Sequence, residues 1–136
     1  MTALFLVAVF VLVLVNGFFV ASEFALVRVR RQRMEALAEE GKAGAALTLR
    51  MLEEISKYLS SCQFGITLAS LGIGFLGEPA IAALVEPAFG GVLSHGLAVA
   101  LALVFAYTFS TALHITIGEQ VPKIWAIVMC SAVENV

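Results

Sequence analysis

Polar groups that can bind a cation interrupt three apolar stretches of this sequence. Ser22 lies in the first stretch, Ser70 in the second and Glu119 at the end of the third. At a helical rise of about 1.5 Å per residue, Ser22 lies about 9 Å before Arg28 and Ser70 about 15 Å beyond Ser60. We therefore expect the three groups to meet in the same half of a membrane. Two hydroxyls and one carboxylate are hard oxygen ligands, which suit Mg²⁺, Ca²⁺ or Na⁺ better than zinc or copper.

The backbone near Pro122 adds an oxygen to this candidate site. Proline has no N–H group, so the carbonyl of Gly118, four residues earlier, lacks the partner that an α-helix would give it. A carbonyl freed at membrane depth is a suitable cation ligand where it lines a cavity. We therefore expect the Gly118 carbonyl to belong to the site, beside the Glu119 carboxylate.

The polar positions also have a second interpretation, as surfaces on which helices pack. Two stripes recur at helical spacing, one in each of the later stretches: Gln63, Thr67, Ser70 and Gly74, and Thr108, Thr111, His114 and Gly118. Stripes of Ser, Thr and Gly also let membrane helices approach closely and hydrogen-bond to one another. The sequence alone leaves both interpretations open.

Several other groups have two interpretations each. His114 is either a proton carrier or a packing residue. Glu23 either pairs with a nearby cation, Arg28 or Lys123, or does not; the sequence does not decide. A further surface for close helix approach is marked by three glycines, Gly72, Gly74 and Gly77.

The elements that must position these groups are membrane-spanning helices. The chain has 136 residues, of which 61% are hydrophobic and 13% charged, whereas soluble domains carry about 25% charged residues. A bilayer core of about 30 Å needs roughly 20 helical residues. We expect spans at about residues 3–28, 58–78 and 94–119, with an outer loop at residues 87–93.

Lysine and arginine residues indicate the orientation. Seven of the eight lie between Arg28 and Lys57, and the eighth is Lys123. The segment between the second and third spans has none. Cytoplasmic loops carry the excess of Lys and Arg in membrane proteins. This distribution predicts an N-terminus outside the cell and a C-terminus in the cytoplasm.

Two further helical regions are expected beside the spans. Residues 31–56 are rich in helix-forming residues, and Gly41 and Gly44 divide them into two short helices, which we expect to form a cytoplasmic hairpin. The apolar part of residues 121–136 is too short to cross a membrane, so we expect a juxtamembrane helix in the interface. The predicted fold is an all-α integral membrane protein, one domain over residues 1–136.

Composition and motifs argue against several functions. The net charge of −2 gives no basis for a nucleic-acid partner. The sequence has no nucleophile–base arrangement, no Gly-rich phosphate loop and no HExxH motif, so we do not expect an enzyme. Cys62 and Cys130 lack the spacing of metal ligands and are expected to be packing residues.

Three segments of the sequence resemble the transmembrane domain of the CorC/CNNM family of magnesium transporters. The segments are VNGFFVASEFALVRVRRQRMEAL, CQFGITLASLGIGFLGEPAIAALVEP and TALHITIGEQVPKIWAI. They occur in this order and cover nearly the whole chain. The resemblance is specific because NGFF–ASE–AL, Q–G–TLASLG–G and GE–VPK occur together.

The resemblance implies a homodimer in the plasma membrane, the inner membrane in bacteria, with three membrane helices per subunit in the lipid bilayer. It implies that Mg²⁺ is bound and moved, with Na⁺ as a coupled ion. The implied cation site comprises Ser22, Ser70, the Gly118 carbonyl and Glu119, with Asn16 either a further ligand or a support for the ligands. Family members usually continue into cytosolic domains that bind nucleotide. We therefore expect residues 1–136 to be an excised membrane domain.

Two functions fit these expectations. The first is Mg²⁺ export coupled to Na⁺ by alternating access, with the cation site between the three helices. The second is a dimeric membrane anchor that senses Mg²⁺ for cytosolic regulatory domains without transport. A purely structural anchor, in which the polar stripes only join helices, is the third hypothesis.

Overall fold

The computed structural model describes residues 2–89 and 94–134, and its regular elements there are all helices. They are α1 (Thr2–Arg28), α2 (Arg31–Glu39), α3 (Ala45–Glu53), α4 (Ile55–Phe89), α5 (His95–Leu113), the π-helix η1 (His114–Gln120) and α6 (Val121–Glu134). Three helical segments, Ala3–Arg28, Ile55–Ala88 and His95–Ala132, are long and apolar enough to cross a membrane. The predicted all-α membrane fold class is thereby confirmed.

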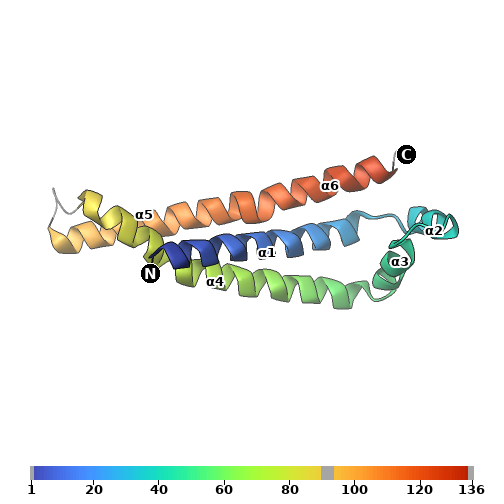
Figure 1. The fold of residues 1–136 in the computed structure, drawn as a ribbon, viewed down its shortest axis with the longest axis horizontal. Coiled ribbons are helices and arrows are strands. Elements are labelled where there is room, and N and C mark those ends of the chain that lie inside the picture. Colours follow the sequence, from blue (N-terminus) through green and yellow to red (C-terminus); the bar gives the residue numbers. More distant parts are fainter. Residues whose placement is uncertain (1, 90–93, 135–136) are drawn as a thin grey trace.

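The three long segments lie alongside one another, and α1 contacts both of the others (Figure 1). On one side α1 packs against α4, and on the other it packs against η1 and α6. α5, η1 and α6 continue one another as a single helical rod. The N-terminus and the end of α4 lie at one end of the bundle, whereas α2, α3 and the C-terminus lie at the other (Figure 1). A chain with three spans must have its N-terminus and its C-terminus at opposite ends of the bundle.

Small side chains make the contacts between the long helices. The buried positions of α5 recur every fourth residue, at Ala98, Ala102, Ala106 and Ser110. Such spacing places them on one helical face, and small residues let membrane helices approach closely. Gly65 does the same for α4, since a Cβ atom there would lie 2.6 Å from the ring of Phe19 on α1.

The predicted glycine surface on α4 is divided between two environments. A Cβ atom at Gly72 would lie 2.9 Å from Leu12 of α1, and one at Gly77 would lie 3.1 Å from the Ser110 hydroxyl of α5. Both glycines therefore serve contacts between helices of this chain. A Cβ atom at Gly74 would meet nothing within 4 Å, so this position faces outward.

Large apolar side chains cover the outer surface of the bundle. Phe18 of α1 is 66% exposed, and Phe64 and Phe75 of α4 are 71% and 82% exposed. So continuous an apolar surface is unfavourable in water. In a membrane protein it is ordinary, because lipid surrounds the helices. The chain is a multi-pass membrane protein.

Two short helices, α2 and α3, follow α1 and contact each other. Gly41 and Gly44, between them, have φ angles of +75° and +92°, a backbone conformation that glycine adopts at little cost. The chain turns at these two glycines between α2 and α3. The location of this pair in the cytoplasm stays a prediction.

The second long helix differs from the expectation at its far end. α4 continues past the predicted span end at residue 78 to Phe89, so residues 87–89 of the predicted outer loop are helical; residues 90–93 lie outside the described part of the chain. Glu78 ends the uncharged run but does not end a helix, because Glu and Ala are good helix formers. Pro79 and Pro87 lie inside α4, as proline does more often in membrane helices than in soluble ones.

The third long segment does not break after residue 119. α6 continues α5 through η1 and extends to Glu134, so the residues of the predicted juxtamembrane helix are helical as far as the structure describes them. Their location in the membrane interface stays a prediction.

Candidate functional site

The centre of the candidate site is a side chain on α1. Asn16 is 0% exposed, and its Nδ2 donates a hydrogen bond of 2.8 Å to the backbone carbonyl of Gly118 in η1. An amide buried in an apolar environment is costly unless it is hydrogen-bonded. This bond therefore joins α1 to the third long segment at a fixed register.

The π-helix explains why the Gly118 carbonyl is available. Pro122 has no N–H, so no α-helical bond can reach Gly118 from that position. The backbone N–H of Val121 donates to the carbonyl of Thr116, five residues earlier, which is the π-helical spacing. The Gly118 carbonyl accepts from Asn16 instead. Single π-helical turns occur often at functional sites.

Ser70 brings α4 to the same point. Its hydroxyl lies 3.5 Å from Oδ1 of Asn16, to which it can donate, and 3.0 Å from Nε2 of His114. The other ring nitrogen of His114, Nδ1, is buried and has no hydrogen-bond partner in the described part of the chain. We call these four residues, Asn16, Ser70, His114 and Gly118, the Asn16 cluster. α1 and α4 each contribute one residue to this cluster, and the third long segment contributes two.

The cluster is closely packed around Gly118. A Cβ atom at this position would lie 3.1 Å from Nδ1 of His114 and 3.3 Å from Nδ2 of Asn16. Both distances are shorter than ordinary van der Waals contact. A larger residue would therefore require the His114 or the Asn16 side chain to shift by a few tenths of an ångström.

Two residues of the predicted site lie outside the cluster. The Ser22 hydroxyl donates to the carbonyl of Phe18 in its own helix at 2.7 Å, and Glu119 is exposed on the surface of the chain. Ser22 is six residues from Asn16, which places it about 120° away around the helix. Glu119 is roughly a quarter of a turn from Gly118. The structure therefore brings together Asn16, Ser70 and Gly118 and adds His114.

The Asn16 cluster borders a groove between α4 and α5. The groove has a volume of about 870 Å³, and it extends about 12 Å along α4 from Ser70 to Glu78. Its polar lining residues are Ser70, Glu78, Tyr107, Ser110, Thr111 and His114. A hydrated cation therefore has space beside the cluster and polar groups along the groove.

Among the described residues, the charged side chains near the cluster do not gather into a second metal site. Lys123 Nζ lies 4.7 Å from the ring centroid of Phe24, a cation–π contact. Among residues 2–89 and 94–134, no ion pair joins Glu23 to Arg28 or Lys123. The same part of the chain contains no group of three His, Cys or acidic side chains suited to a metal. Amide, hydroxyl and carbonyl oxygens are thus the ligands that this site offers.

A family model described as the cyclin M transmembrane N-terminal domain (CNNM) matches residues 6–133. This chain belongs to that family. The resemblance indicated by the NGFF, TLASLG and GE–VPK segments is confirmed. The matched range contains every member of the Asn16 cluster and also Ser22 and Glu119.

Several curated proteins are similar to this CNNM domain. UPF0053 protein YhdT of Bacillus subtilis is 45% identical over 90% of this chain and 27% of its own length. UPF0053 protein YhdP of the same organism is 42% identical over 94% of this chain and 29% of its own length. Uncharacterized protein Rv1841c of Mycobacterium tuberculosis is 44% identical over 79% of this chain. The chain spans less than a third of each relative, and their names state no activity.

Proposed function

We propose that this CNNM domain transports Mg²⁺ and exports it in exchange for Na⁺ by alternating access. One observation carries the proposal: the hydrogen bond from Asn16 to the Gly118 carbonyl, with the Ser70 hydroxyl beside it. It places neutral hard oxygens from all three long segments at one point inside an apolar bundle. Mg²⁺ binds hard oxygen ligands and usually keeps several waters, for which the α4–α5 groove has room.

Cation binding at this point requires an exchange of partners. The Gly118 carbonyl would release the N–H of Asn16 and face the cation, and the Asn16 amide would turn its Oδ1 inward. Ser22 and Glu119 remain proposed ligands, and they reach the cluster only if α1 and the third segment rotate relative to one another. Two arrangements of the same helices are what alternating access requires.

A homodimer is part of the proposal. Glu119 and Thr111 are exposed on the single subunit within a candidate membrane span. A carboxylate that faces lipid is costly and normally faces a protein partner or a water-filled cavity. A second copy packed over this face would cover Glu119 and close the side of the α4–α5 groove.

The direction of transport sets an energy requirement. With the basic segment in the cytoplasm, Mg²⁺ export moves two charges against the membrane potential, at about 4.6 kcal/mol for each ~100 mV. Export therefore needs a driving ion, and inward Na⁺ is the proposed one. Na⁺, like Mg²⁺, binds hard oxygen ligands.

Transport is tested with the purified chain in sealed vesicles that contain a Mg²⁺-sensitive dye. The proposal predicts Mg²⁺ flux that a Na⁺ gradient accelerates, that Ser70→Ala reduces and that Ser61→Ala leaves unchanged. Ser61 is the matched control because its hydroxyl donates to the Lys57 carbonyl of its own helix. Flux that ignores the Na⁺ gradient would refute the coupling.

A sensing function is the second candidate. It is favoured by the observation that the chain spans less than a third of its relatives, whose remaining length can hold regulatory domains. Mg²⁺ binding at the Asn16 cluster with no flux in the same vesicles would establish the domain as a sensing anchor and exclude transport by the domain itself.

A further inference from the structure

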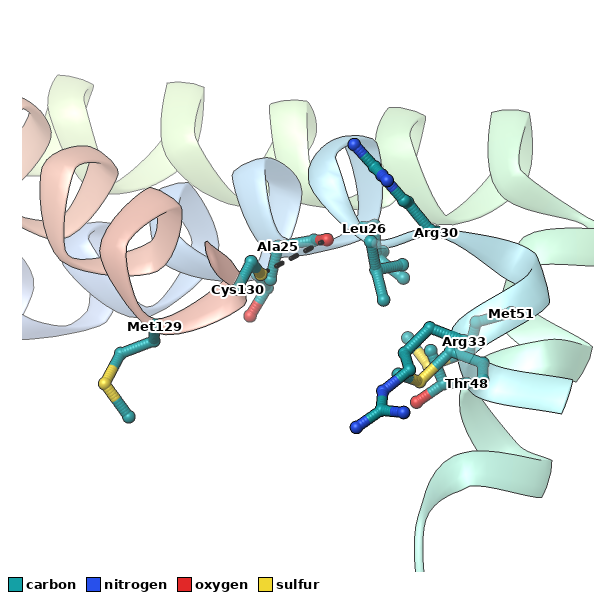
Figure 2. A pocket seen from close by; sticks show the side chains of 11 residues that line it. Ala25, Leu26, Arg30, Arg33, Thr48, Met51, Met129 and Cys130 are labelled. Carbon is teal, nitrogen blue, oxygen red and sulfur yellow. Dashed lines mark hydrogen bonds between the residues drawn. The ribbon is translucent and has the colours of Figure 1, made fainter. Parts of the chain in front are cut away.

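A second cavity lies at the opposite end of α1 from the N-terminus. Its volume is about 360 Å³, and it is enclosed by the last turns of α1, by α2, by α3 and by α6. Figure 2 shows the side chains that line it, with Ala25, Leu26 and Cys130 on one side and Thr48 and Met51 on the other. No member of the Asn16 cluster lines it, but Ser22, one of the proposed cation ligands, does.

One cationic side chain of the cavity, Arg33, has no anionic partner among the residues that the structure describes. The guanidinium of Arg33 points into the open space beside Thr48 and Met51 (Figure 2), and its Nε is buried without a hydrogen-bond partner. The cavity lining includes no acidic residue. The carboxylates of Glu35 and Glu53 pair with Arg31 instead, at 2.9 Å and 3.8 Å. The charge of Arg33 is therefore uncompensated within the described part of the chain.

The rest of the cavity is mostly apolar. Leu26, Met51 and Met129 belong to its lining, and they come from α1, α3 and α6. The candidate span of α1 ends at Arg28, so the cavity extends from the apolar span into the basic segment that follows. A ligand that fits must combine an anionic group at the Arg33 end with a hydrocarbon part at the other.

We infer that this cavity binds one anionic phospholipid, with its phosphate on Arg33 and an acyl chain along Leu26 and Met129. Guanidinium groups form strong, directional hydrogen bonds with phosphate. The position at the end of a span is where lipid headgroups lie, and anionic headgroups attract basic segments next to a span. Membrane lipid surrounds the cavity at high concentration, unlike a soluble anion. The inference does not depend on Mg²⁺ transport.

The single tryptophan of the chain, Trp125, allows a direct test. It lines an adjoining hollow together with Ala25, Met129 and Cys130, and Met129 and Cys130 also line the cavity. Brominated acyl chains quench tryptophan fluorescence on contact. The purified chain is placed in bilayers of phosphatidylcholine that contain a minor fraction of brominated phosphatidylglycerol or, for comparison, brominated phosphatidylcholine.

We expect phosphatidylglycerol to quench Trp125 at about tenfold lower mole fraction than phosphatidylcholine, the effect of about one charge-assisted hydrogen bond. Arg33→Gln should remove this difference. The control, Arg50→Gln, removes the same charge from an exposed position on α3 outside the cavity and should retain the difference.

Three outcomes would overturn the inference. Equal quenching by the two lipids in the parent chain excludes a headgroup-specific site, whether or not the variants fold. A preference that both variants lose equally indicates diffuse attraction to the basic segment. A preference that soluble glycerol phosphate abolishes identifies a site for small anions, not for lipid.

Discussion

The side-chain amide of Asn16 on α1 donates a hydrogen bond of 2.8 Å to the backbone carbonyl of Gly118, 102 residues later in the chain. The bond exists because Pro122 cannot supply the helical N–H that would otherwise occupy this carbonyl. A side chain of one helix thus donates to a backbone carbonyl of another helix that lacks its own helical hydrogen bond. The Ser70 hydroxyl and the His114 ring complete the arrangement from α4 and the third segment.

Replacing Asn16 should destabilise the fold. Asn16→Ala leaves the Gly118 carbonyl buried without a partner, at a cost of about 1–3 kcal/mol. We expect a lower thermal unfolding temperature in detergent. Thr67→Ala is the control, because the Thr67 hydroxyl is exposed and donates only to Gln63 in its own helix. Equal effects of the two substitutions would contradict the role given to Asn16.

Adding a methyl group at Gly118 should disturb the cluster through sterics alone. The new Cβ would lie 3.1 Å from His114 Nδ1 and 3.3 Å from Asn16 Nδ2, and overpacking of this kind costs about 1–3 kcal/mol. We predict that Gly118→Ala lowers both the unfolding temperature and Mg²⁺ affinity. Gly96→Ala, at an exposed position on α5 outside the groove where a Cβ meets nothing within 4 Å, should lower neither. A Gly118→Ala variant with parental stability would show that the packing is loose.

Replacing Pro122 should separate stability from binding. Pro122→Ala restores an N–H that can bond to the Gly118 carbonyl, so the π-helical turn should revert towards α-helix and compete with Asn16. We expect Mg²⁺ affinity to fall while the unfolding temperature is maintained or raised. Pro87→Ala, at an exposed position on α4, is the control. If Pro122→Ala left Mg²⁺ affinity unchanged, the freed carbonyl would not be a ligand.

Glu119 should matter for the ion and not for the fold. This residue is exposed on the single chain, so Glu119→Gln removes no packing within the chain. The account predicts weaker Mg²⁺ binding, seen by titration calorimetry, and nearly unchanged stability of the ion-free protein. Glu39→Gln, at an exposed position on α2, should leave both unchanged. Parental Mg²⁺ affinity in Glu119→Gln would remove this residue from the proposed site.

Much of the fold was predictable because the bilayer imposes length and composition on its spans. Three long apolar helical segments, each able to cross a membrane, follow from the sequence. The far end of α4 did not, since charge marks the end of an apolar run and not the end of a helix. The pattern of apolar and charged residues therefore located the helices more accurately than it located the ends of the helices.

The site was only partly predictable. The sequence indicates how deep in the membrane a side chain lies, but contact between two side chains also depends on the direction in which each points around its helix axis. Ser22 and Asn16 lie in the same helix, but about 120° apart, and Asn16 faces Gly118. The π-helix also changes the rotational phase after His114, which a regular spacing of 3.6 residues does not anticipate. The four-residue spacing of His114 and Gly118 was the feature of the sequence from which the place of His114 beside Gly118 could have been predicted.

The most direct test of the central claim is Mg²⁺ binding by titration calorimetry to the purified parent chain, beside Ser70→Ala and Ser61→Ala. The account predicts binding in the parent and in Ser61→Ala, and about tenfold weaker binding in Ser70→Ala, which loses one oxygen ligand or its hydrogen bond to Asn16. Equal affinity in Ser70→Ala and Ser61→Ala, or no binding by the parent, would contradict a cation site at the Asn16 cluster.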